Sequence, residues 1–323
     1  MNKLIVSSSP HVRSSLTTQR IMIDVIVALL PAVIASVVLF RMKAVWMILI
    51  CVISALATEA LFQLAAKRSQ TIMDGSALVT GLILAMNLHA NVPYWQGAVG
   101  SVFAVGVVKL CFGGLGKNFA NPAVAGRIFL LIAFVETAGG AYSYKTVLNN
   151  SASVIETMAT PLNKINEASA KYLPSLLDMF LGRGNCGGAL GEVCSLALLI
   201  GFAYLMIRRV ITWHAPVCFV GTVFVLAWIL TGNFTFALYH VLAGGLLFGA
   251  IFMATDYVTT PITKLGKAVF GVGCGLITVL IRFWGAYPEG VSFAILFMNI
   301  LTPYIEKWTK ARPLGAKRGG AKK

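Results

Sequence analysis

Apolar residues recur along the chain in runs long enough to cross a lipid bilayer as helices, which takes about 20 residues each. The first run, residues 21–40, contains Asp24 and Pro31 and is otherwise almost wholly apolar. It is too long for a signal-peptide core and no small-residue cleavage site follows it, so we interpret it as a retained span. The pattern predicts an all-α integral membrane protein of about ten transmembrane helices. Their approximate limits are 21–40, 44–66, 74–89, 95–112, 121–138, 191–207, 213–231, 234–254, 267–282 and 290–306.

One long connection, residues 139–190, separates two groups of five predicted spans. Structureless loops longer than about 15 residues are uncommon, so we expect a short amphipathic helix around residues 162–180. An odd number of spans per half would place the halves in opposite orientations, as in transporters built from inverted repeats, although no clear repeat is visible in the residues. The predicted division is an N-terminal arm (1–20), a first transmembrane half (21–138), the loop (139–190), a second half (191–306) and a tail (307–323).

The composition agrees with a membrane protein. Apolar residues make up 58% of the chain and charged residues 11%, against about 25% charged in ordinary soluble domains. The net charge of +15 gathers in short connections and at both ends, where it encodes topology and meets anionic lipid, rather than in a nucleic-acid-binding surface. Six cysteines show no CxxC pairing and no histidine at metal-ligand spacing, so no metal site is predicted; a disulfide between Cys186 and Cys194 is left open.

Basic residues in the connections predict the orientation. With the N-terminal arm in the cytoplasm, five inner placements are basic, against one outer turn that carries Arg41 and Lys43. The inner basic residues are Lys67, Arg68, Lys117, Arg208, Arg209, Lys264, Lys267 and those of the tail. We therefore expect a multi-pass protein of the bacterial inner (cytoplasmic) membrane with both termini cytoplasmic and the loop 139–190 outside.

Three polar stretches interrupt the apolar pattern on the predicted inner side: residues 74–77, 113–122 and 255–261. Irregular backbone at membrane depth persists only where it is buried in protein or lines a polar cavity. Each stretch alone is also compatible with an ordinary interfacial turn, in which Asp74 would cap a helix. Together they predict one shared polar site, with Asp74, Asn118, Asn121 and Asp256 as its candidate residues.

Charged residues within apolar runs are costly and usually mark a pathway or a partner. Six lie within or at the edges of the predicted spans: Asp24, Glu59, Lys109, Arg127, Glu192 and Arg282. Most are near span ends, where the charged head of the side chain can reach the interface. Glu59 lies well inside the second span, which is compatible either with a functional role or with a structural ion pair.

Several segments, in order along the chain, resemble a known family. They are Ser9–His11, Ile21–Val25, Ala28–Pro31, Asp74–Gly81, Gly113–Arg127, Gly191–Glu192, Ala254–Tyr257 and Thr260–Pro261. They look like the D subunit of the Rnf-type electron-transport complexes and its relative NqrB of the sodium-pumping NADH:quinone reductase. The chain length is closer to that of the Rnf-type D subunit.

The resemblance implies a covalent FMN, joined through its phosphate to the last threonine of a Ser/Thr-Gly-Ala-Thr sequence. By position this residue is Thr160, in Thr157-Met158-Ala159-Thr160, where Met158 replaces the usual glycine. A flavin transferase would attach it in the outer loop. The resemblance also implies a second, noncovalent flavin (riboflavin or FMN) among the spans, for which the polar site of Asp74, Asn118, Asn121 and Asp256 is the candidate.

The resemblance further implies electron transfer within a six-subunit membrane complex that works with ferredoxin and NAD and moves sodium ions or protons. No GxGxxG motif follows a strand, so NADH is expected to bind another subunit. The alternative is a channel or secondary transporter for a small polar solute, which needs no flavin-accepting hydroxyl. A purely structural scaffold is disfavoured by the polar interruptions at membrane depth.

Overall fold

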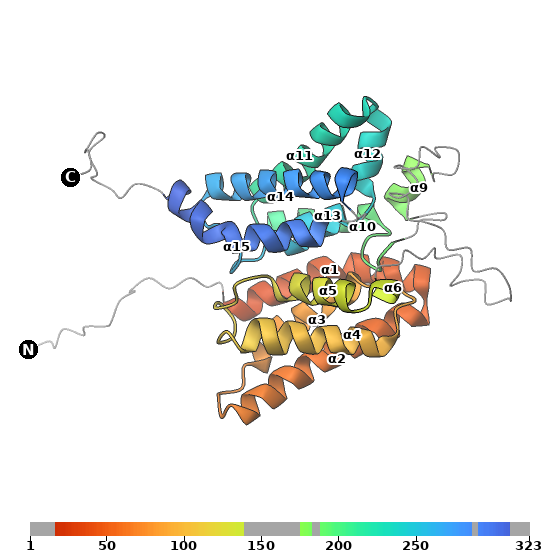
Figure 1. Cartoon of the computed structure of the whole chain (residues 1–323). Helices are drawn as coiled ribbons and strands as arrows, with labels where there is room; N and C mark the ends of the chain where they lie inside the picture. The colour runs from red at the N-terminus through yellow and green to blue at the C-terminus, as the bar shows by residue number, and fades with distance from the viewer. Residues whose placement is uncertain (1–16, 139–174, 183–187, 286–289, 311–323) are drawn as a thin grey trace, which may run out of the picture.

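The computed structural model describes residues 17–138, 175–182, 188–285 and 290–310, and throughout these ranges the chain forms helices and turns without strands. Figure 1 shows two groups of helices, one from each half of the chain. The first group comprises α1 (Thr18–Phe40), α2 (Met42–Ala65), η1 (Ile72–Asp74), α3 (Ser76–Met86), α4 (Tyr94–Val102), the π-helix η2 (Phe103–Leu110), α5 (Pro122–Ala133) and α6 (Val135–Ala138). The second comprises α9 (Leu176–Leu181), α10 (Ser195–Ile207), α11 (His214–Thr231), α12 (Phe234–Leu242), α13 (Leu246–Phe248), the π-helix η4 (Gly249–Met253), α14 (Lys264–Trp284) and α15 (Val291–Thr309).

Four helices are long and apolar enough to cross a membrane: α1, α2, α11 and α14. A fifth candidate is the segment from Phe234 to Met253, which bends by 61°. The prediction of an all-helical membrane protein is thus confirmed at the level of four to five spans. The apolar helices α3, α5 and α10 have only 11, 12 and 13 residues, which at 1.5 Å per residue extend about 17–20 Å. The count of ten complete spans therefore stays a prediction.

The eighth predicted span differs most from the structure. It is expected as one helix over 234–254, but the structure breaks it between α12 and α13. Gly244 and Gly245 have φ angles of 71° and 67°, in the left-handed region that ends a right-handed helix. Two adjacent glycines in an otherwise apolar run therefore change the direction of the chain.

Small residues let the helices approach closely. A side chain at Gly201 of α10 would lie against the backbone oxygen of Ala28 in α1, which joins the two groups. Gly271 and Gly275 of α14 similarly face α11, where a Cβ at Gly271 would lie 2.5 Å from the oxygen of Ala215. This Gly-x-x-x-Gly spacing is typical of helix packing in lipid. There the hydrophobic effect does not drive helices together, and close van der Waals contact between them stabilises the pair.

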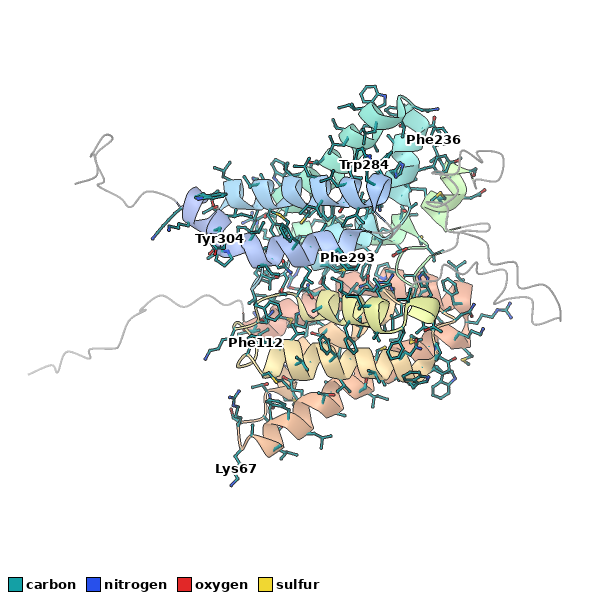
Figure 2. The ribbon with its side chains drawn as sticks, viewed as in Figure 1. Lys67, Phe112, Phe236, Trp284, Phe293 and Tyr304 are labelled. Carbon is teal, nitrogen blue, oxygen red and sulfur yellow. The ribbon has the colours of Figure 1, made fainter. Side chains whose placement is uncertain are left out.

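Large apolar side chains cover the outside of the helices, as expected for contact with lipid. In the apolar windows of α1 and α2, only 33% and 22% of the residues are buried. Figure 2 shows Tyr304 and Lys67 at one end of the helices and Trp284 at the other. Trp284 and Tyr304 are 67% and 60% exposed. Aromatic side chains at both ends are typical of the two membrane interfaces.

Candidate functional site

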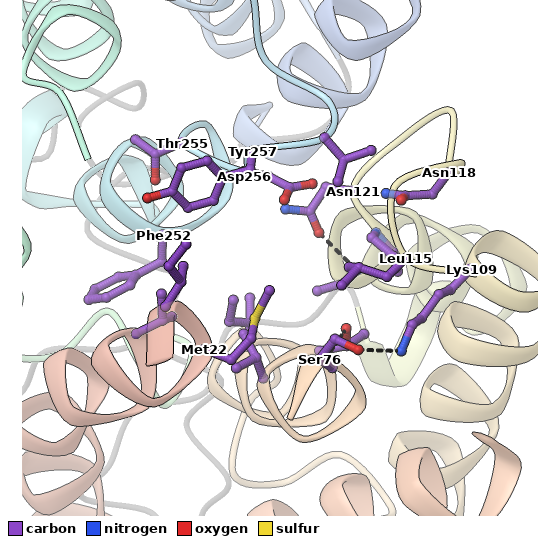
Figure 3. A pocket seen from close by; sticks show the side chains of 18 of the residues that line it. Met22, Ser76, Lys109, Leu115, Asn118, Asn121, Phe252, Thr255, Asp256 and Tyr257 are labelled. Carbon is purple, nitrogen blue, oxygen red and sulfur yellow. Dashed lines mark hydrogen bonds between the residues drawn. The ribbon is translucent and has the colours of Figure 1, made fainter. Parts of the chain in front are cut away.

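The three polar stretches predicted from the sequence lie around one pocket. Figure 3 shows Phe252 and Thr255 on one side of it and Leu115, Asn118 and Lys109 on the other. The first turns of α1 and the end of α10 complete the wall, through apolar residues that include Met22 and Leu205. The pocket therefore lies between the two groups of helices, with an apolar wall and polar groups at a few points.

Asn118 and Asn121 line this pocket, and their side chains differ in how many of their polar atoms form hydrogen bonds. Both polar atoms of the Asn121 side chain have partners: its Oδ1 accepts from the Ala123 amide at 3.0 Å, and its Nδ2 donates to the Met253 oxygen at 3.2 Å. Asn118 is 8% exposed and its Nδ2 donates to the Ala120 oxygen at 3.0 Å. Its Oδ1 is buried and accepts from no residue that the structure describes, which is uncommon for a buried polar atom.

Asp256 lies at the same pocket beside Tyr257. The Asp256 carboxylate accepts from the Thr259 hydroxyl at 3.0 Å. Burial raises the pKa of the Asp256 carboxyl above its usual value of 3.8, while the bonds from Thr259 and from two backbone amides oppose this shift. Burial also raises the pKa of the Tyr257 phenol, although about half of this residue is exposed.

Asp74, the fourth predicted residue, does not line the pocket. Its carboxylate Oδ1 accepts from the backbone amide of Ser76 at 2.8 Å and from the Ser76 hydroxyl at 2.6 Å. It therefore holds the first residue of α3, although the N-cap position itself is occupied by Gly75 and not by Asp74. Ser76 takes its place in the pocket wall.

Lys109 is the residue of this site that sequence reasoning did not assign to it. It is 2% exposed, lines the pocket, and donates to Glu59 Oε1 at 2.8 Å and to Ser76 Oγ at 2.6 Å. Glu59 and Lys109 are 50 positions apart in the sequence, and both were visible only as isolated charges within apolar runs. The structural ion pair considered for Glu59 is present.

The other charges within apolar runs also have partners. Asp24 is buried and accepts from the Tyr204 hydroxyl at 3.0 Å and from Arg208 at 3.3 Å, a contact between α1 and the end of α10. Arg127 donates to the Asn87 oxygen at the end of α3. The remaining two are Glu192, which accepts from the Ala189 amide at 3.3 Å, and Arg282, which donates to the Ala243 oxygen at 3.2 Å.

Two sequence predictions fall outside the described residues. Thr160, the predicted FMN-bearing residue, lies between α6 and α9 in the range 139–174. Cys186, the first half of the disulfide that was left open, lies in the range 183–187. The predicted amphipathic helix around 162–180 is described only at its end, where α9 begins at Leu176.

Residues 5–315 match the family model described as "NQR2, RnfD, RnfE family". The chain belongs to this family. It is 45% identical to the D subunit of the Na⁺-translocating ferredoxin:NAD⁺ oxidoreductase complex of Acetobacterium woodii, over 97% of this chain and 95% of that one. It is 39% identical to the D subunit of the proton-translocating complex of Clostridium ljungdahlii (98% of each chain) and 35% identical to that of the ion-translocating oxidoreductase complex of Stutzerimonas stutzeri (96% and 95%).

The comparisons confirm the family resemblance found in the sequence. These relatives are subunits of redox-driven ion translocases, which agrees with the prediction of an enzyme subunit rather than a solute transporter. Membership of this family and the long apolar helices also agree with a multi-pass membrane protein. The relatives named for ferredoxin and NAD⁺ differ in the ion that they move, which is Na⁺ in one and a proton in the other.

Proposed function

We propose that the chain is the flavin-carrying membrane subunit of an ion-translocating ferredoxin:NAD⁺ oxidoreductase. It passes electrons through FMN on Thr160 and couples this transfer to the movement of Na⁺ or H⁺. Support comes from full-length similarity to the D subunits of two complexes with this activity, at 45% and 39% identity. Because these two relatives move different ions, their similarity to this chain does not favour one coupling ion over the other. The partners are the other subunits of a six-subunit complex, with a flavin transferase for maturation.

The pocket is the site for a second, noncovalent flavin, and its residues fit such a ligand. Flavin rings are mostly apolar with an edge of donors and acceptors, and ligand sites of this kind combine an apolar wall with a few placed polar groups. The observation that carries this assignment is Asn118, which lines the pocket and whose buried Oδ1 has no donor among the described residues. Asn118 would accept from the ring edge, while Met22 and Leu115 exclude water. A bound flavin supplies the electron-accepting group that the side chains of this site lack.

The proposed topology has ten segments, both termini in the cytoplasm and the loop 139–190 on the outer side of the inner membrane. Figure 1 supports it, because the start of α1 and the end of α15 lie at one end of the helices, whereas α6 and α9 lie at the other. The pocket contains Met22 from the start of α1 and is therefore near the cytoplasmic end. Thr160 lies in the outer loop of this topology. The two flavins would thus serve opposite faces of the membrane.

The covalent assignment is tested on the purified full chain, made in cells that contain a flavin transferase. We expect ultraviolet fluorescence of the chain in a denaturing gel, its loss in Thr160→Ala, and FMN mass on the peptide that contains Thr160. Thr146→Ala, in the same loop but outside the attachment motif, is the matched control and should stay fluorescent. A chain without linked flavin, or an unchanged signal in Thr160→Ala, would refute the proposal and favour the transporter alternative.

The pocket assignment is tested by riboflavin binding in nanodiscs, in a Thr160→Ala background that removes the covalent flavin. Loss of one hydrogen bond to a buried group costs about 1–1.5 kcal/mol, so Asn118→Leu should weaken binding about tenfold. Asn91→Leu is the control, since Asn91 contacts Lys43 and does not line the pocket. Equal affinity in the two variants would contradict the assignment.

A further inference from the structure

Lys109 stands between the pocket and a buried carboxylate. Its side chain lines the pocket, whereas Glu59, to which its Nζ donates at 2.8 Å, does not. Both side chains are almost fully removed from solvent, with exposures of 2% and 0%. Figure 3 shows Lys109 reaching along the pocket wall to Ser76. The ammonium is therefore the cationic group among the described residues that line this pocket.

The hydrogen bonds of Glu59 are unevenly distributed. Its Oε1 accepts from Lys109, from Thr71 Oγ1 at 3.0 Å and from Gln63 Nε2 at 3.4 Å. Its Oε2 is buried and accepts from none of the residues that the structure describes. Two of the three ammonium protons of Lys109 go to Glu59 and Ser76. One donor thus remains for a group in the pocket.

The charges that face the ammonium come from three elements. Glu59 belongs to α2, and Asp74, at the end of η1, is connected through the Ser76 hydroxyl of α3, which donates to Asp74 Oδ1 at 2.6 Å. Asp256 is the carboxylate of the pocket wall contributed by the second group of helices. Lys109 is therefore bonded to one carboxylate, linked to a second through the Ser76 hydroxyl, and shares the pocket with a third.

A contribution to folding stability does not by itself explain the buried ion pair of Glu59 and Lys109. Desolvation of two charges often exceeds their attraction, so a buried ion pair is weak evidence for a stabilising role. Lys109 also lies in the π-helix η2, and single π-helical turns frequently occur at functional sites. The local backbone is thus irregular at the residue that brings a positive charge to the pocket wall.

We propose that Lys109 tunes the reduction potential of a flavin in this pocket. Its ammonium, restrained by Glu59, stabilises the negative charge that the flavin gains on reduction. This inference rests on the proposed function of the pocket as a flavin site. Each electron that the flavin ring receives from a donor adds one negative charge to the ring. This charge is neutralised only when the ring also takes up a proton from water. The ammonium favours the reduced ligand, and the Glu59 carboxylate limits that preference.

The test is a redox titration of riboflavin bound to the full chain in nanodiscs, in the Thr160→Ala background, with dithionite as reductant. We expect Lys109→Met to weaken binding of reduced relative to oxidised riboflavin by about tenfold, which lowers the two-electron midpoint potential by about 30 mV. Glu59→Gln should shift the potential in the opposite direction by a similar amount. Lys109→Arg keeps the charge and should restore most of the parent value. Lys117→Met, which removes an exposed lysine outside the pocket wall, is the control.

A second comparison protects the test against misfolding of Lys109→Met, which leaves a buried carboxylate unpaired. The double variant Glu59→Gln/Lys109→Met contains no buried charge at this pair and should have a lower potential than Glu59→Gln alone. Riboflavin binding with the same potential in all variants, or shifts of one sign for Glu59→Gln and Lys109→Met, would overturn the role of Lys109 and leave the flavin site standing. Absence of riboflavin binding to the parent chain would instead overturn the proposed flavin site, and this inference with it.

Discussion

Arg282 holds the break between α12 and α13, and its removal should destabilise the protein strongly. The side chain is 2% exposed and donates to the backbone oxygens of three residues at the end of α12: His240, Ala243 (3.2 Å) and Gly244 (3.1 Å). A helix that ends inside the membrane layer leaves carbonyl groups without intrahelical donors. In lipid, water cannot replace the missing donors.

The size of the effect follows from these bonds. A hydrogen bond from a charged donor contributes about 1.5–3 kcal/mol, and each buried acceptor left unsatisfied costs about 1–3 kcal/mol. Relaxation of the chain recovers part of the loss, so we expect Arg282→Met to lower the free energy of unfolding by about 4 kcal/mol, within the range typical of breaking buried charged contacts. Arg282→Lys should lose about half as much, because an ammonium presents fewer donors in a fixed plane.

The measurement is unfolding of the full chain in mixed micelles of a mild detergent with increasing sodium dodecyl sulfate. Tryptophan fluorescence and the reaction of the buried thiols of Cys51 and Cys274 with a thiol reagent report the transition. Arg68→Met, at an exposed position, is the matched control. A loss below about 1 kcal/mol in Arg282→Met would show that the break is supported by other donors, and would refute the reasoning.

Three further predictions test the fold and the site. Gly271→Val should separate α11 from α14 and lower the melting temperature in detergent, whereas Gly221→Ala, where no atom lies within 4 Å, should not. Because the folded-state pKa of Asp256 is raised, unfolded chains release this proton first as pH rises above 3.8, and stability declines until the folded-state pKa is passed. Asp256→Asn should thus unfold like the parent at pH 4 and be the more stable of the two at pH 8. Tyr204→Phe should cost about 1 kcal/mol on detergent unfolding, because buried Asp24 loses a donor, and Arg208→Gln should cost less, because that guanidinium is exposed.

Much of the helix pattern could be predicted from the sequence, because in lipid the apolar length of a segment largely decides its structure. The first predicted span, 21–40, corresponds to α1 at Thr18–Phe40, and the seventh, 213–231, to α11 at His214–Thr231. The grouping of Asn118 with Asp256 in one pocket was also predictable, from the shared inner side of the polar stretches. Whether these residues bind a flavin stays a prediction.

Features that depend on contacts between distant segments could not be predicted in this way. The pairing of Lys109 with Glu59 arises because a π-helix in one segment faces a second segment 50 positions earlier. Asp74 is a polar residue of the kind expected in a ligand site, but its carboxylate accepts a hydrogen bond from the backbone amide of Ser76 at the start of α3. A single sequence does not distinguish a polar residue that caps a helix from one that faces a ligand, since both occur at helix starts.

The buried arginines show what the structure adds to the sequence pattern of this fold. As isolated charges in apolar runs, Arg127 and Arg282 looked like pathway residues or side chains that reach the interface, yet both donate to backbone oxygens where a helix ends. Arg127 reaches the Asn87 oxygen, 40 positions earlier, and Arg282 reaches Ala243 and Gly244, 39 and 38 positions earlier. Guanidinium carries five donors and is always charged, so it suits a helix end that presents several carbonyls away from water. At both positions, the arginine therefore satisfies the end of a helix about 40 residues upstream. We expect a relative that lacks the counterpart of Arg282 to have an uninterrupted helix where α12 and α13 are separated here, and a broken helix at that position would contradict this interpretation.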